Sequence, residues 1–146
     1  MPKSTNTCNA ILALIFNATT WTSMAQNATA SPYTSLYLSL HNSTGPGLTD
    51  SQTVNETAYT NYARVGVTRA SGAGGWTVST NTSTNASLTQ FAQCGASGDT
   101  LTYVAIGTAS SGTGHVLYEG DLNSNLVVSN GIQPQFAATS LTITES

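Results

Sequence analysis

Charged residues are scarce in this chain. Only 6% of its 146 residues are Asp, Glu, Lys or Arg, against about 25% in an ordinary soluble domain. The basic residues are Lys3, Arg64 and Arg69, and the formal net charge is −3. Three cations cannot neutralise the roughly six to ten phosphates of a typical DNA contact, and they offer little attraction to an anionic lipid surface. We therefore expect neither nucleic acid nor membrane as a partner.

The residue types that most enzymes use are also rare. Lys3 is the only lysine, so the body of the chain has none for a phosphate-binding loop or a Schiff base. The chain has no G-x-S-x-G motif. His41 and His115 do not share a zinc-ligand spacing with the cysteines. The paired carboxylates of glycoside hydrolysis are not recognisable either. We expect no enzymatic activity, no catalytic residue, no cofactor and no metal.

Cysteine is limited to Cys8 and Cys94, which lie far apart in the sequence. Nothing in their spacing favours a disulfide, so two buried thiols are the favoured interpretation. A domain of this length can bury roughly 68–70% of its unfolded surface, and it needs no disulfide framework to hold it together.

An apolar run near the start, NAILALIFNATTWTSMAQ (residues 9–26), resembles a secretory signal peptide. It is too short to span a bilayer, which takes about 20 residues. Apolar residues with the i, i+3, i+4, i+7 spacing of a helix face are Cys8, Ile11, Leu12 and Ile15. We therefore expect an amphipathic helix, capped by Asn6 or Thr7 and buried against a sheet or a neighbouring subunit.

From Thr34 onward the sequence has the two-residue period of β-strands. TSLYLSLH places three leucines on one face and Ser35, Tyr37, Ser39 and His41 on the other, which predicts a half-buried strand. LTYVAIG is apolar on both parities, which predicts a central strand covered on both faces. Further strands are predicted at residues 61–68, 74–80, 86–91, 115–122, 125–129, 132–138 and 140–145.

This pattern predicts an all-β fold, an antiparallel β-sandwich resembling a jelly roll, with one short N-terminal helix. No linker or internal repeat is visible. We expect a single domain over residues 1–146, with a helical arm at 1–30 and the sandwich at 31–146.

One face of this sheet is the candidate subunit interface. In the predicted strand NYARVGVT, Tyr62 and Arg64 share the polar parity, and Tyr37 has the same parity in its own strand. Tyrosine and arginine are enriched at interface hot spots. We expect a change at Arg64 to impair assembly rather than folding. A solvated sheet face is the alternative.

Three residues are candidate structural anchors: Trp76, Arg69 and Phe136. Trp76 is expected in the core, and an exposed sugar-stacking platform is the alternative. Arg69 is expected past the end of its strand or buried with a carboxylate, because an unpaired buried charge is very costly. The available acids are Asp50, Glu56, Asp99, Glu119, Asp121 and Glu145.

The motifs resemble a family of tailed-bacteriophage structural proteins often labelled phage tail fiber proteins, some of which are capsid decoration or cement proteins. The matching pieces, in order, are NAILALIF, SLYLSLH, NETAYTNYARVGVTR, GGWTVSTNTSTNASLTQF, LTYVAIGTASSGTGHVLYEGDL and VVSNGIQPQFAATSLTITES.

The resemblance covers nearly the whole chain. It implies a β-sandwich virion component and no catalytic residues. We expect a homo-oligomer, a dimer or trimer, that binds the major capsid protein on the outer surface of the capsid. The alternative is a tail-tip or tail-fibre protein that takes part in attachment to the host surface. Small size and the lack of long repeats favour the head, and negative charge disfavours the DNA-facing interior.

Overall fold

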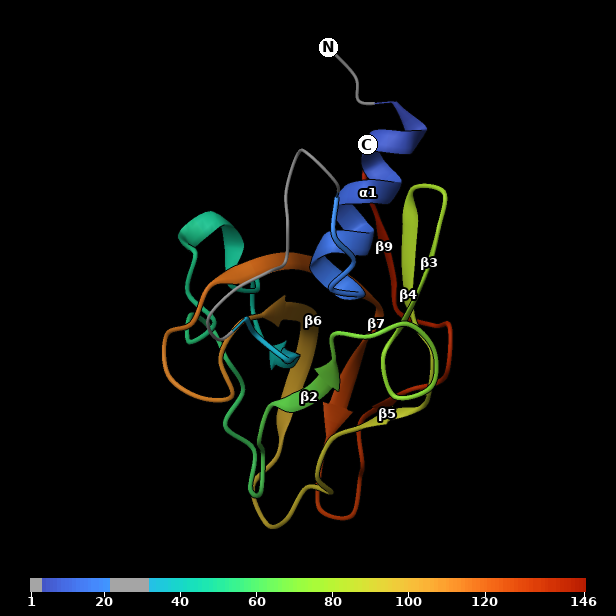
Figure 1. Cartoon of the computed structure of the whole chain (residues 1–146). Coiled ribbons are helices and arrows are strands. Elements are labelled where there is room, and N and C mark those ends of the chain that lie inside the picture. Colours follow the sequence, from blue (N-terminus) through green and yellow to red (C-terminus); the bar gives the residue numbers. More distant parts are fainter. Residues whose placement is uncertain (1–3, 22–31) are drawn as a thin grey trace. The chain divides into compact units, whose positions relative to one another are not determined.

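The computed structural model describes residues 4–21 and 32–146 (Figure 1). Its elements, in chain order, are the helix α1 (Thr5–Phe16), β1 (Ser35–His41), the 3-10 helix η1 (Gly47–Thr49), β2 (Val65–Thr68), β3 (Trp76–Ser79), β4 (Thr82–Asn85), β5 (Thr89–Gln90), β6 (Asp99–Gly107), β7 (Val116–Val128), β8 (Gln135–Phe136) and β9 (Thr142–Thr144). The pairs β1–β6, β6–β7, β3–β4 and β4–β9 are all antiparallel. The predicted fold class is therefore confirmed: the described chain is mostly β, with antiparallel sheets and one short α-helix.

The chain forms two compact units, each built from separated segments. Unit 1 comprises the described part of Met1–Ser35 together with Val67–Thr89 and Phe136–Ser146, and unit 2 comprises Leu36–Gly66 and Gln90–Gln135. The single domain over residues 1–146, with its boundary after residue 30, stays a prediction.

In unit 1, α1 packs against β3 and β4 (Figure 1). The helix begins where the Ser4 hydroxyl accepts a hydrogen bond from the Thr7 amide at 3.2 Å, so Ser4 is the cap and not Asn6 or Thr7. Cys8, Leu12 and Phe16 are its buried residues, one per turn, whereas Ile11 and Ile15 of the predicted apolar face are only half-buried.

The sheet of unit 1 has the strand order β3-β4-β9, and one of its faces carries only hydroxyl side chains. The two cross-strand rows of that face are Thr77, Thr84 and Thr142, and Ser79, Thr82 and Thr144. Strand β4 was absent from the prediction because TSTN contains no apolar residue. It forms nonetheless, because Thr fits a pleated surface and packs against its cross-strand neighbours.

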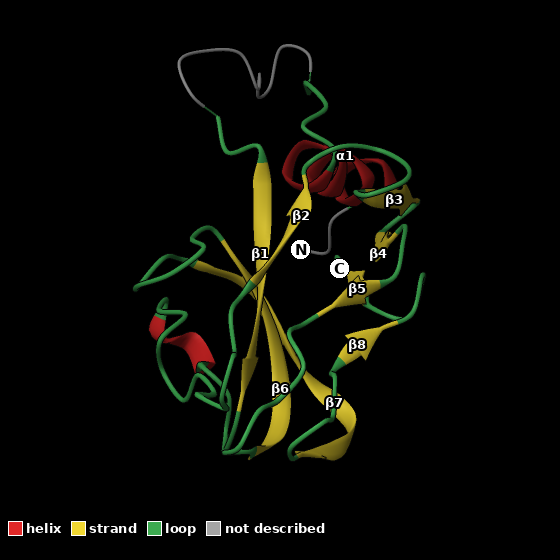
Figure 2. Cartoon of the chain, turned by 90° about the horizontal axis from the view of Figure 1, so that it is seen from below, coloured by secondary structure: helices red, strands yellow, loops and turns green. Residues whose placement is uncertain are grey.

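Unit 2 is organised on β1, β6 and β7, which run side by side (Figure 2). The register pairs Leu38 with Ile106 and Leu40 with Val104, which places these apolar side chains on one face of the sheet. Leu36, Leu38 and Leu40 are buried, as predicted. The opposite face of β1 was predicted to be a subunit contact or, as the alternative, solvated, but Ser39 and His41 are fully buried within the chain as well.

Strand β7 replaces two predicted strands, residues 115–122 and 125–129. Tyr103 pairs with Asp121 while Leu101 pairs with Leu126, so residues 122–125 lie opposite Thr102 alone. The polar NSN segment, residues 123–125, lies in this large bulge. Sequence analysis had placed a break between two strands there. The strand predicted at residues 61–68 begins only at Val65.

Candidate functional site

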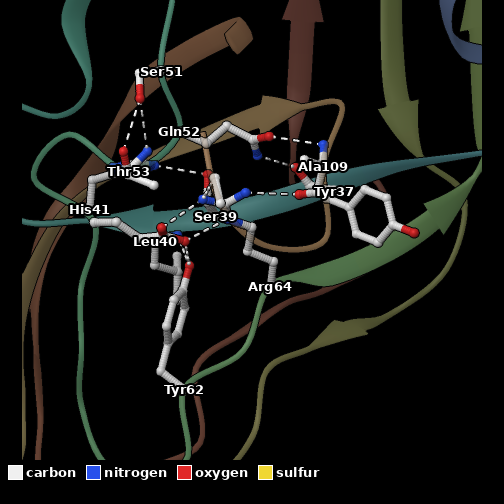
Figure 3. Close-up of polar contacts among 12 residues, drawn as sticks. Tyr37, Ser39, Leu40, His41, Ser51, Gln52, Thr53, Tyr62, Arg64 and Ala109 are labelled. Carbon is white, nitrogen blue, oxygen red and sulfur yellow. Dashed lines mark hydrogen bonds and ion pairs between the residues drawn. The ribbon is translucent and has the colours of Figure 1, made fainter. Parts of the chain in front are cut away.

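Arg64 and Glu56 form the centre of a polar network in unit 2, and Figure 3 labels Arg64 with its neighbours Tyr62 and Leu40. The Arg64 Nε donates to Glu56 Oε1 at 2.6 Å, and Nη2 donates to Oε2 at 2.7 Å. The same guanidinium donates to the carbonyls of Ala109 at 2.9 Å and Gly112 at 2.7 Å. The Arg64 side chain is 2% exposed. A buried guanidinium is stable here because a two-point carboxylate contact and two carbonyls satisfy its donors.

Tyr62 completes this pair. Its hydroxyl donates to Glu56 Oε1 at 2.8 Å and accepts from the Leu40 amide at 3.1 Å. Burial raises the pKa of Tyr62, and the Glu56 carboxylate raises it further. The hydrogen bond to Glu56 is the main cause that raises the pKa of Arg64. The phenol therefore stays protonated and the guanidinium stays charged.

The loop that carries Glu56 is held beside β1. Glu56 forms an isolated antiparallel bridge with His41, and the Thr57 amide donates to the Leu40 carbonyl at 3.0 Å. The His41 ring contacts this loop through Nδ1, which lies 2.9 Å from the Val54 carbonyl. Its Nε2 lies 2.8 Å from the Ser39 hydroxyl. Because a carbonyl only accepts, Nδ1 carries the proton. Burial lowers the pKa of His41, so the buried ring is neutral.

Gln52 is a buried polar residue of this loop that sequence analysis missed. Its side-chain oxygen accepts from the Ala109 amide at 3.0 Å, and its Nε2 lies 3.4 Å from the Tyr37 carbonyl (Figure 3). Gly107 lies against this side chain so closely that a Cβ there would collide with it. Nothing in the sequence separates Gln52 from the other polar loop residues, because only the fold brings it to β6.

The three predicted interface residues do not form one exposed face. Tyr62 and Arg64 meet on Glu56, whereas the Tyr37 ring points away from them and is half-exposed (Figure 3). Arg64 was expected on a polar sheet face, but it precedes β2 and is buried by Glu56 and two loop carbonyls. A change at Arg64 therefore acts on folding first. A subunit contact at this place stays a prediction.

Arg69 lies just past the end of β2, as one of the two predicted alternatives had it, but its partner is not a carboxylate. Its Nε donates to the Ile15 carbonyl at 2.6 Å, and its Nη2 to the Leu14 carbonyl at 2.7 Å. Nη1 donates to the Tyr33 carbonyl at 2.7 Å. Leu14 and Ile15 belong to the last turn of α1, where carbonyls lack helical partners and the helix dipole is negative. Burial lowers the pKa of Arg69.

The two aromatic anchors are buried to different extents. Trp76 is fully buried, and its ring lies 4.6 Å from that of Phe16 between centroids. Its indole Nε1 has no hydrogen-bond partner within the part of the chain that the structure describes. Phe136 is half-buried at the end of β8. Cys8 and Cys94 are both buried free thiols, as favoured from the sequence.

The remaining acids occupy different surroundings. Asp99 is half-buried. Burial alone would raise its pKa, but hydrogen bonds from Thr57, Asn42 and the Thr100 amide outweigh this and lower it. Asp50 contacts His115 at 2.8 Å with both side chains more than half exposed. Within residues 4–21 and 32–146, no cluster of His, Cys, Asp and Glu is arranged to hold a metal ion.

No helix among the described residues is long and apolar enough to cross a membrane.

The fold and this network define a class: a small β-rich protein in which buried polar contacts fasten a long loop onto a sheet. A family model described as "Podophage GP4 fiber I protein gp80" matches residues 2–144. The chain belongs to this family, which confirms the predicted relationship to tailed-phage structural proteins and indicates a virion component. A search of curated proteins found no match.

Proposed function

We propose that this protein is an external structural subunit of a tailed-phage virion and that it acts by binding alone. The observation that carries this proposal is the disposition of the charges. Arg64 and Arg69 are held by internal partners, whereas Glu119 and Asp121 on β7 are exposed. The described surface is therefore acidic. Such a surface is repelled by packaged DNA and suits the outside of the particle.

Binding without catalysis is supported by the state of the two histidines, the side chains most used for proton transfer near neutral pH. His41 is buried with both ring nitrogens engaged by Val54 and Ser39. His115 contacts Asp50 at the surface. The side chains of Gln52, Tyr62 and Arg64 fasten the loop that carries Glu56, so they serve the scaffold.

A capsid decoration, or cement, subunit bound to the major capsid protein is the first candidate placement. It is supported by the small size of the chain and by the lack of long repeats of the kind that build a fibre shaft. A small subunit with little charge can cover the junctions of a shell.

A tail-tip or fibre component that contacts the host surface is the second candidate. The wording of the family description, which names a fiber protein, favours it. The two placements differ in copy number and in the neighbouring protein. Both placements are on the outside of the virion, and in both the protein binds without catalysing a reaction.

Quantitative mass spectrometry of purified virions, after separation of heads from tails, tests the proposal. A copy number tied to that of the major capsid protein in the head fraction supports the decoration subunit. A small copy number confined to the tail fraction supports the fibre component. Absence of the chain from mature virions would overturn the proposal for both placements.

A further inference from the structure

Three loops of unit 2 are joined at one end of its sheet, at the lower end of Figure 1. We call residues 58–61, 92–98 and 126–133 the three-loop tip; the third segment begins with the last three residues of β7. The first two loops are joined by hydrogen bonds from the Thr60 amide to the Ser97 carbonyl at 2.8 Å and from the Gly95 amide to the Thr60 carbonyl at 3.0 Å. The second and third are joined through the Cys94 amide and the Ile132 carbonyl at 2.8 Å.

Side chains reinforce this framework. The Gln93 amide group donates to the Gly131 carbonyl at 2.7 Å, and the Tyr59 hydroxyl donates to the Ala92 carbonyl at 2.9 Å. Tyr59 is 2% exposed, so this residue of the tip is buried within the protein. A surface that is fixed before binding loses little conformational freedom when a partner docks on it.

The three-loop tip also presents apolar side chains to solvent. Val127 is 68% exposed, Ile132 41% and Leu126 37%. The Ile132 amide donates to the Ser129 carbonyl and closes a turn at residues 129–132, which Ile132 ends and which Val127 precedes by two positions. Leu126 and Val127 are successive residues of β7, so their side chains lie on opposite faces of the strand, and Val127 and Ile132 are the exposed apolar residues beside the turn.

No residue of the three-loop tip is charged. The next acid along the chain, Asp99, has its carboxylate engaged by Thr57 and Asn42. Elsewhere on β7 the exposed apolar residue Leu117 lies two positions from Glu119 and four from Asp121. A contact between two copies through that part of β7 would bring like charges together.

We propose that copies of this chain associate with one another through the three-loop tip. A second copy carries the same net charge of −3, so it can approach most easily where neither copy presents a carboxylate. At the tip, association buries Val127 and Ile132 without desolvating a charge. The inference does not depend on whether the subunit is located on the head or the tail. Its failure would leave the virion fractionation result untouched.

The test is sedimentation velocity of the full chain over a concentration series, at low and at high sodium chloride. We expect the wild-type chain to form a dimer or trimer, and we expect added salt to leave this association unchanged or to strengthen it. Val127→Lys should raise the dissociation constant at least about tenfold. Leu117→Lys, on the same strand but outside the tip, is the matched control and should associate as the wild type does.

Ile132→Lys is the second tip variant, and circular dichroism checks that each variant is folded. If Val127→Lys fails to fold, Ile132→Lys decides the question alone. The proposal is overturned if the wild type stays monomeric, if salt dissociates it, if folded tip variants associate normally, or if Leu117→Lys impairs association as strongly as they do.

Discussion

The guanidinium of Arg64 donates hydrogen bonds to both carboxylate oxygens of Glu56, with Nε 2.6 Å from Oε1 and Nη2 2.7 Å from Oε2. This pair joins the start of β2 to a loop that is itself bridged to β1 at His41. The chain has only three basic residues, and one of them is used here to close its own fold. Stability should therefore depend strongly on this contact.

Glu56→Gln should lower the free energy of unfolding by about 3–5 kcal/mol, because it leaves the buried Arg64 without its counter-charge. Urea denaturation measures the loss. The matched control is Asp50→Asn, which changes the exposed contact with His115 and should cost less than about 1 kcal/mol. Equal losses in the two variants would contradict the structural role of the Arg64–Glu56 pair.

Arg69→Met keeps the apolar stem but removes three charge-assisted hydrogen bonds to the carbonyls of Leu14, Ile15 and Tyr33. We expect a loss of about 2–3 kcal/mol. Hydrogen exchange should quicken at the α1 amides before it quickens in β6. Arg69→Lys keeps the positive charge and should therefore recover part of the loss. Recovery should be incomplete, because an ammonium does not have the planar fork of donors with which the guanidinium contacts three carbonyls. Unchanged protection of α1 in Arg69→Met would refute the capping role.

Trp76→Ala should destabilise the protein by about 3–5 kcal/mol, because it leaves a cavity against Phe16. Trp76→Phe should cost much less, since the indole nitrogen has no hydrogen-bond partner among the described residues. Thermal or urea unfolding of the two variants gives the comparison. A loss below about 1 kcal/mol for Trp76→Ala would show that the ring is not a core residue and would revive the sugar-platform alternative.

Stability should fall as the pH is lowered from 7 to 5. Burial holds the pKa of His41 below its ordinary value, so in this range the unfolded chain binds a proton that the folded chain excludes. The stability that depends on a neutral His41 is fully present above about pH 6.5 and declines below it. Asp99, with its lowered pKa, should add a separate loss below about pH 4. If His41→Gln keeps the slope between pH 7 and 5, the buried imidazole is not its source.

The fold class was predictable because the leucines of β1 and the apolar run of β6 have clear strand patterns. Strand β4 was not, because TSTN has no apolar residue, and its pairing with β3 and β9 decides its structure. The division of residues 115–129 into two strands was wrong for a related reason. A polar bulge looks like a turn until the partner strand is known.

The candidate site was predictable only in part. Sequence analysis identified the arginines as costly to bury without partners, and for Arg64 the partner is the acid nearest to it in sequence, Glu56. For Arg69 the partner is a helix end, which is invisible in a list of carboxylates. Side-chain parity also failed for Arg64, because the strand starts one residue after it.

The central claim is that this chain is an external structural subunit of the virion. Immunoelectron microscopy of intact, DNA-filled virions, with Fab fragments raised against the purified chain, tests it most directly. We predict regular labelling on the outside of intact particles, either over the head or at the tail. Labelling that appears only after the capsid is opened, or no labelling of mature particles, would contradict the claim.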